Sequence, residues 1–300
     1  MKTILTAGLT PSWQHVLEFD SLRIDAVNRA VDSLWFSAGK SVNAALAIHT
    51  LGGKVRALFP GGGENARKMR EELTQMGLET RILPTDAELR ICTTLVDRCA
   101  QTITELVENG EPLTETELEA WRRLFTQEVQ NADLVVISGS LPQKTPAGLY
   151  EEMVSQIPAG VPSILDFRGE GLLACLKYRP LAVKPNREEL EQTVGRPLSD
   201  EHELLDACRM LNAAGAQWVV VSDGPKALWA VSAEESIRLE PPKVTPTPEH
   251  PVLCPIGCGD ALTGALALAI SRGETMRSAL SFAMDAAAQN LLQLTSCRFG

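Results

Sequence analysis

Near residue 260 the chain reads Cys254-Pro255-Ile256-Gly257-Cys258-Gly259-Asp260-Ala261-Leu262-Thr263-Gly264-Ala265. Two glycines flank one small residue, an aspartate follows, and small and apolar residues with helical character continue to Ile270. This order predicts a tight turn that leads into a helix N-terminus, where several backbone N–H groups lack intrahelical partners. The helix dipole adds positive potential there, so the stretch predicts an anion site suited to phosphate or to a negative transition state.

Asp260 allows two interpretations. Its charge would repel a bound anion, so as a functional residue it fits a general base that takes the proton from a hydroxyl attacking a phosphoryl group. The alternative is structural, with a Gly-rich turn and Asp260 capping a buried helix. The stretch alone leaves both open.

The whole composition narrows the class of protein. Three hundred residues can form one sizeable α/β domain or two smaller ones, and the net charge of −10 argues against a general nucleic-acid binder. Seven cysteines without a Cys-x-x-Cys pair fit reduced thiols. The longest apolar-rich run, Ala261–Ile270, is too short to span a bilayer, and Met1 leads directly into a strand-like segment. We therefore expect no membrane segment, no signal peptide and a cytoplasmic location.

The rest of the chain alternates between expected strands and helices, as in a parallel α/β protein. Strands are expected at 3–9, 55–59, 134–137, 163–166, 181–183, 218–222 and 227–231, and the all-apolar 134–137 is expected to be buried on both faces. Helices are expected at 41–51, 65–76, 114–129, after 146, at 171–176, from 186, and at 200–213, 260–270 and 276–294. Segments of about 13–36 and 90–108 have β character and no covering helix, so they predict a lid. No linker divides residues 1–300, and a Pro-rich connector spans 241–251.

Two groups of polar residues could hold a sugar or its phosphate. Gly39, Lys40 and Asn43 open a helix behind a Gly turn, where backbone N–H groups and Asn43 could bind hydroxyls or phosphate and Lys40 could supply the cation. The alternative is an ordinary helix start with a solvated lysine. Arg90 and Arg29, in the two lid segments, could grip a phosphate or could be surface arginines.

Three loops follow the ends of expected strands, where open parallel sheets bind ligands: Ser138-Gly139-Ser140-Leu141-Pro142, Lys184-Pro185-Asn186-Arg187-Glu188-Glu189 and Ser222-Asp223-Gly224. In the second loop, Asn186 and Glu189 could position Mg²⁺ through water while Lys184 faces nucleotide phosphates. They could equally form a capping box. The first and third loops could be plain connections. The four histidines show no metal spacing.

Together and in this order, the Gly-Lys-x-x-Asn, Lys-Pro-Asn-x-x-Glu and Gly-x-Gly-Asp motifs resemble those of the PfkB/ribokinase family of carbohydrate kinases, over nearly the whole chain. The resemblance implies one ribokinase-like α/β/α domain over 1–300, with a mainly parallel sheet and a small β lid. It implies Asp260 as catalytic base and Gly257, Cys258 and Gly259 as anion hole. It places Mg²⁺ at Asn186 and Glu189 and ATP at the following residues: Lys184, Asn186, Ser222, Gly224 and, near the adenine, Asn290.

Asn28-Arg29, Arg90 and Ser-Gly-Ser-Leu-Pro look like the branch that acts on phosphorylated hexoses, the 1-phosphofructokinase and tagatose-6-phosphate kinase branch. The resemblance then implies substrate contacts at the following residues: Gln14, Arg29, Gly39, Lys40, Asn43, Arg90, Ser138 and Gly139. Two departures lie on the sugar side. Gln14 stands where the branch has an aspartate, and Ala38 stands where the motif has a glycine, so a methyl is expected to crowd the substrate.

The expected function is therefore ATP- and Mg²⁺-dependent phosphorylation of a ketohexose phosphate of the fructose-1-phosphate or tagatose-6-phosphate type. The expected partners are a phosphosugar, ATP and a second copy of the chain bound through the lid, with no nucleic acid and no membrane. Two alternatives stay open. One is a kinase of an unphosphorylated sugar or nucleoside, and the other is a non-catalytic sugar-phosphate sensor on the same fold.

Overall fold

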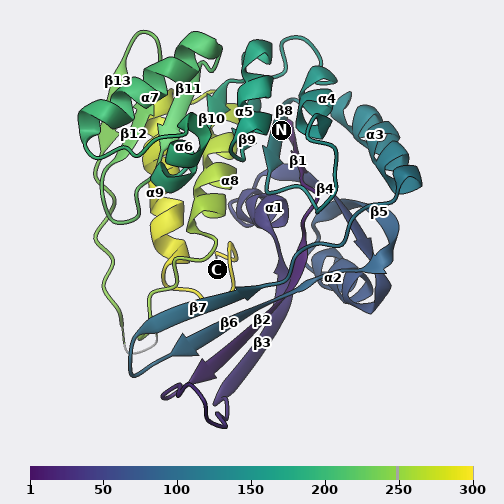
Figure 1. Ribbon diagram of the computed structural model, residues 1–300, viewed down its shortest axis with the longest axis vertical. Coiled ribbons are helices and arrows are strands. Elements are labelled where there is room, and N and C mark those ends of the chain that lie inside the picture. Colours follow the sequence, from purple (N-terminus) through teal and green to yellow (C-terminus); the bar gives the residue numbers. More distant parts are fainter. Residues whose placement is uncertain (248–249, 300) are drawn as a thin grey trace.

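A nine-stranded sheet runs through the larger part of the molecule, in the order β13-β12-β11-β10-β9-β8-β1-β4-β5 (Figure 1). The computed structural model describes residues 1–247 and 250–299, so residues 248 and 249 of the expected connector lie outside the described residues. The strands are β1 (Thr3–Ala7), β4 (Lys54–Gly62), β5 (Glu79–Glu88), β8 (Leu134–Ser138), β9 (Ser163–Asp166), β10 (Ala182–Val183), β11 (Trp218–Val221), β12 (Leu228–Val231) and β13 (Ser236–Leu239). Neighbours from β11 to β5 pair in parallel, and β12 and β13 run antiparallel at one edge. The expected mainly parallel sheet is confirmed.

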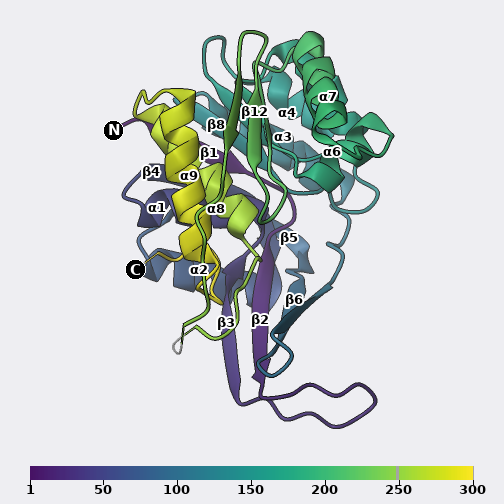
Figure 2. The same ribbon diagram turned by 90° about the vertical axis from the view of Figure 1, so that its left-hand side faces the viewer.

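Helices cover both faces of this sheet because its central strands are apolar on both sides. On β1, Ile4 belongs to one core and the next residue, Leu5, to the other, as the two-residue period of a strand requires. Figure 2 shows α8 and α9 on one side of the sheet and α3, α4, α6 and α7 on the other. The helices are α1 (Lys40–Thr50), α2 (Gly63–Gln75), α3 (Glu115–Val129), α4 (Leu149–Ser155), α5 (Glu170–Cys175), α6 (Arg187–Val194), α7 (Glu201–Ala214), α8 (Cys258–Ser271) and α9 (Met276–Asn290), with a 3-10 turn at Leu176–Tyr178.

A separate four-stranded sheet forms the lid and projects from the larger part of the molecule (Figures 1 and 2). Its strands are β2 (Ser12–Phe19), β3 (Asp32–Ala38), β6 (Ile91–Asp97) and β7 (Thr102–Val107), in the order β3-β2-β6-β7. A small core lies beneath them, where Val16, Phe36 and Ala38 pack with Val252 of the connector. The Ala38 methyl is thus part of the lid core, and the expectation that it crowds the substrate is wrong.

Some segments differ from the expectation. The two edge strands, β5 and β13, were not expected from the sequence, because polar residues interrupt their apolar pattern. Residues 20–31 form a loop rather than strands. There the Asn28 side chain accepts from the Arg23 amide at 2.9 Å and donates to its carbonyl at 2.7 Å, so local side-chain bonds replace strand pairing.

Candidate active site

The turn before α8 is held open by a glycine. Gly257 has φ +82° and caps the helix without a side-chain bond. Within the described residues, the amides of Gly257, Gly259 and Asp260 have no hydrogen-bond acceptor. The Cys258 amide donates to the Pro255 carbonyl at 3.2 Å, so the expectation that it belongs to the anion hole is wrong. The free donors are thus the amides of Gly257, Gly259 and Asp260, and such donors at a helix N-terminus are suited to bind an anion.

Asp260 lies in the first turn of α8 and is buried. The Asn43 side chain donates to its Oδ2 at 2.7 Å. This contact joins α1 to α8, and Gly264 allows it, since a Cβ there would lie 2.5 Å from the Ala44 carbonyl oxygen. Burial raises the pKa of Asp260 to about 7, against the opposing effect of Lys40. A carboxyl with this pKa suits a general base at neutral pH.

Four charged side chains meet beside Asp260, at the carboxyl ends of β9 and β10. Lys40 Nζ lies 3.0 Å from Glu189 Oε1 and 3.6 Å from Asp166 Oδ1. Lys184 Nζ lies 3.5 Å from Asp166 Oδ2. Lys40 therefore bridges two carboxylates rather than standing free. Lys184 is buried beneath the turn at Gly257–Gly259, called the anion loop below, rather than exposed to solvent.

Asp166 was not predicted as a site residue, although it is buried with two ammonium partners. Burial opposes its charged form, but Lys184 and Lys40 outweigh burial and lower its pKa. The charge of Asp166 also raises the pKa of Lys40. The available signal was a carboxylate at the end of a predicted strand of a parallel sheet, which is an expensive place for an unpaired charge.

Asn186 and Glu189 form the capping box of α6. Asn186 Oδ1 accepts from the Glu189 amide at 2.8 Å, and Glu189 Oε2 accepts from the Asn186 amide at 3.0 Å. The structural interpretation of this motif is thus confirmed. Glu189 Oε1 remains outside the box and points to Lys40 and Arg168. In the described part of the chain, no group of three or more His, Cys, Asp or Glu side chains could hold a metal by itself.

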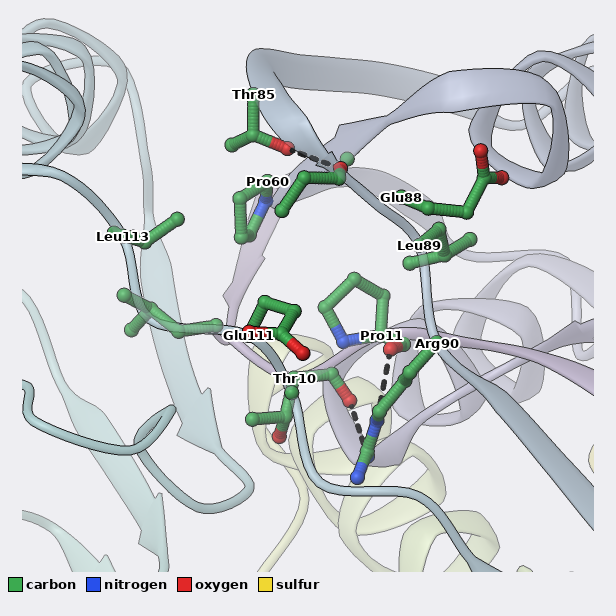
Figure 3. Close-up of a pocket in the computed structure, with 13 residues that line it drawn as sticks. Thr10, Pro11, Pro60, Thr85, Glu88, Leu89, Arg90, Glu111 and Leu113 are labelled. Carbon is green, nitrogen blue, oxygen red and sulfur yellow. Dashed lines mark hydrogen bonds between the residues drawn. The ribbon is translucent and has the colours of Figure 1, made fainter.

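A strip of backbone at Thr10 and Pro11 connects the residues expected on the sugar side. Gly39 packs on it so closely that a Cβ would lie 2.7 Å from Pro11 Cα, and the position of a Cβ on Gly139 is 3.3 Å from Thr10 Oγ1. Arg90 donates to the carbonyls of Thr10 and Pro11 at 2.8 and 3.1 Å (Figure 3), and to the carbonyl of Glu108 at 2.9 Å. Of its five N–H donors, three are so occupied and two remain.

The other residues expected to contact the sugar, Gln14, Ser138 and Arg29, differ in burial and in hydrogen bonding. Gln14 is buried and donates to Thr94 Oγ1 at 2.8 Å, so its amide nitrogen is already bound within the lid sheet. Ser138 is buried at the end of β8, and its hydroxyl has no partner among the described residues. Arg29 is exposed in the 20–31 loop and makes no ion pair with a described residue, so the structure does not bring it to the site.

The expected nucleotide side has one displaced residue. Ser222 pairs with Asn186 in an isolated bridge, so the loops after β10 and β11 lie together, with Gly224 two residues further on. Asn290, by contrast, is fully buried, and its Nδ2 donates to the Ile256 carbonyl at 2.8 Å. Asn290 was expected near the adenine, and the structure shows its side chain bound to backbone on both ends, beneath the turn that precedes α8.

Residues 17–298 match the family model of pfkB family carbohydrate kinases. The chain belongs to the pfkB family of carbohydrate kinases. Free backbone amides and the buried carboxyl of Asp260 lie together at the N-terminus of α8. The family-model match and the observed fold thus agree, and the chain is a carbohydrate kinase.

Relatives within the pfkB family include 1-phosphofructokinase of Haemophilus influenzae, 28% identical over 287 residues that cover 94% of this chain and 89% of the relative. Phosphofructokinase-2 from Escherichia coli, solved in complex with fructose-6-phosphate, superposes with a TM-score of 0.87 at 26% identity, covering 99% of this chain and 96% of that one. Its tetrameric inhibited form gives a TM-score of 0.88 at 26% identity, covering 97% and 95%. No helix within the described residues has the length and apolar character needed to cross a bilayer.

Proposed function

We propose that this pfkB kinase transfers the γ-phosphoryl group of ATP to a hydroxyl of a phosphorylated ketohexose of the fructose-1-phosphate or tagatose-6-phosphate type. One observation supports the reaction type: the buried carboxyl of Asp260, with a pKa of about 7, lies in the same helical turn as backbone amides that have no acceptor. The relatives that act on phosphofructose support the substrate class, by similarity alone.

The chemistry follows from the positions of the side chains. Asp260 accepts the proton of the attacking hydroxyl, and the Asn43 amide orients the carboxylate that receives it. The amides of Gly257, Gly259 and Asp260 face the charge that develops on the transferring phosphoryl group. Closure of the lid excludes water, so that the phosphoryl group reaches the sugar and not solvent.

A divalent cation fits the carboxylates that Lys40 bridges. Asp166 Oδ1 is buried and lacks a hydrogen-bond partner among the described residues, and Glu189 Oε1 lies outside the capping box. Mg²⁺ is commonly held by one or two carboxylates plus substrate phosphates, with water completing the shell. Asp166 and Glu189 would hold Mg²⁺ in this way, and it would neutralise charge on the ATP phosphates.

A kinase of an unphosphorylated sugar is the second candidate, and the sugar-side cations favour it. Lys40 is paired with two carboxylates, Arg90 with three carbonyls, and Arg29 is exposed in the 20–31 loop. Glu88 and Glu111 line the pocket beside Arg90 (Figure 3). Under the leading proposal, the two remaining N–H donors of Arg90 hold the substrate phosphate.

An ADP-release assay over matched pairs of phosphorylated and free sugars separates the two candidates. Turnover with a ketohexose phosphate and none with the free sugar is the expected result. Arg90→Ala should raise KM for the phosphosugar more than tenfold if Arg90 binds its phosphate. Turnover only with a free sugar, with KM unchanged in Arg90→Ala, would establish the second candidate instead. Asp260→Asn should abolish turnover in either case.

A homodimer through the lid completes the proposal. Ile24, Val27, Val31 and Trp35 are 90%, 78%, 49% and 44% exposed, and all lie on β3 or on the loop that leads into it. Large apolar side chains gathered on one surface of a protein commonly mark an interface. The tetrameric form of phosphofructokinase-2 from Escherichia coli shows that a relative associates, and it supports self-association here only by similarity.

A further inference from the structure

Asn290, the last residue of α9, is a fully buried amide beneath the anion loop. Its Nδ2 donates to the Ile256 carbonyl at 2.8 Å and lies 3.3 Å from Cys258 Sγ. Its Oδ1 accepts from the Cys297 amide at 2.7 Å. Both ends of the side chain are thus bound to backbone, one to the loop and one to the C-terminal turn.

The bond to Ile256 determines where the next amide points. The described peptide bonds are all trans, and in a trans peptide the C=O and N–H point in opposite directions. The Ile256 carbonyl faces inward to Asn290, so the Gly257 N–H of the same peptide faces outward. The amides of Gly259 and Asp260, in the first turn of the helix that follows, are also free.

The loop needs such a restraint. Gly257 has φ +82° and no side chain, so the Ile256–Gly257 peptide can rotate more easily than at any other residue type. A rotated peptide would turn its N–H into the protein and remove one donor from the anion site. Ser296 Oγ is the other donor to the Ile256 carbonyl, at a longer 3.4 Å, and Ser296 Cβ would lie 2.6 Å from a Cβ on Gly257.

We propose that Asn290 is a positioning residue for phosphoryl transfer, because its amide fixes the orientation of the Gly257 N–H. The proposal rests on the function proposed above, which places the transferring phosphoryl group at this loop. The Gly257 amide meets charge that develops during transfer, so Asn290 contributes to kcat more than to substrate binding.

Three variants test this role. Asn290→Ala removes the donor, and Asn290→Asp keeps the size and the acceptor for Cys297 but puts an oxygen against the Ile256 carbonyl. Both should lower kcat by about 10- to 100-fold with KM for ATP within about twofold, since oxyanion donors contribute on this scale. Asn212→Ala is the matched control, because Asn212 Nδ2 also donates to backbone carbonyls, those of Ala216, Gln217 and Val231, near the C-terminal end of α7. It should lower stability and leave kcat unchanged.

A binding measurement separates positioning from folding. Affinity for ADP with aluminium fluoride, a mimic of the transferring phosphoryl group, should fall at least about tenfold in Asn290→Ala, while affinity for ADP alone changes by less than about twofold. Should neither Asn290 variant fold, Ser296→Ala removes only the weaker donor and should lower kcat by about two- to fivefold.

Three results would overturn the proposal: kcat of Asn290→Ala within about twofold of wild type, restored kcat in Asn290→Asp, or a raised KM for ATP with unchanged kcat. The last would return Asn290 to the nucleotide pocket. If the wild-type enzyme is active and a variant gives any of these results, only the proposed role of Asn290 is refuted. A wild type that turns over no sugar refutes the proposed function as well.

Discussion

Asp260 shows how a single residue here serves function at the expense of stability. Burial raises its pKa to about 7, while Lys40, Asn43 and Lys184 favour the charged form and oppose that rise. The result is a carboxyl that is ionised in a large fraction of molecules at neutral pH and still basic enough to take a proton. The same balance gives two predictions at this scale.

The pH dependence of kcat/KM should follow the ionisation of Asp260. Only the deprotonated carboxylate can accept the hydroxyl proton, so kcat/KM should rise with pH through about 7 and level off above it. Asn43→Ala removes a hydrogen bond that favours the carboxylate, so the inflection should move to higher pH. A profile that is flat between about pH 6 and pH 8 would contradict the role of Asp260 as base.

Asp260→Asn should stabilise the protein at neutral pH. The folded-state pKa of about 7 lies above the ordinary value of 3.8, so stability is lost as pH rises from about 4 to about 7. The neutral amide avoids this loss, and Tm should rise by roughly 5 °C at pH 8 and change little at pH 4. Scanning calorimetry at both pH values tests this, and an equal Tm for both proteins at pH 8 would contradict it.

At the scale of elements, the site is made by the ends of α1, α6 and α8, which meet where β9 and β10 end. Each helix start has a local device, the Gly39 turn, the Asn186 capping box and the Gly257 turn. These devices were readable from the sequence because they depend on residues three or four positions apart.

The Gly257 turn should tolerate no side chain. In Gly257→Ala the new Cβ would meet Ser296 Cβ at 2.6 Å in a backbone with φ +82°, so we expect a loss of roughly 2–4 kcal/mol and of nearly all turnover. Gly52→Ala is the control, since Gly52 has φ +79° with open space around it. It should cost about 1 kcal/mol and leave kcat unchanged, as denaturant titration and kinetics can measure. Equal effects of the two variants would contradict the role of the close contact.

Glu189→Gln should weaken the use of Mg²⁺ without unfolding α6. Glutamine at this position retains the capping box, while Oε1 loses the charge that faces Lys40 and Arg168. The Mg²⁺ concentration for half-maximal turnover should rise about tenfold. Exposed Glu188→Gln, one residue earlier, should leave it unchanged. If Glu189→Gln and Glu188→Gln have the same Mg²⁺ requirement, Glu189 acts only in the capping box of α6.

At the scale of the whole molecule, the chain crosses between the main part and the lid at residues 8–11, 39, 89–90 and 108–114, and side chains join the two parts as well. Val252, from the connector after β13, packs in the lid core, and Gln101 Nε2 reaches the Pro251 carbonyl at 3.5 Å. The outer apolar residues of the lid remain exposed, which is why we assign them to a second copy of the chain.

Val27→Asp should convert the proposed dimer to monomer, because it buries a charge in an apolar interface. Sedimentation velocity measures the change, and the mass should fall from twice 32.5 kDa to 32.5 kDa. Met210→Asp is the matched control, since Met210 is 48% exposed on α7, away from the lid. A wild type that sediments as a monomer, or an unchanged mass in Val27→Asp, would contradict a lid dimer.

The sequence by itself determined the alternation of strands and helices, the capping-box motif of Asn186 and Glu189, and the helix that Gly257 opens, because these follow from periodicity and from contacts within one helical turn. Only the tertiary structure decided the partners of Lys40 and the burial of Asp166 and Asn290. Lys40 and Glu189 are 149 positions apart in sequence, and Asn43 and Asp260 are 217 apart. Such pairs depend on which strand ends adjoin in the sheet and on how closely α1 approaches α8, and no local pattern contains that information.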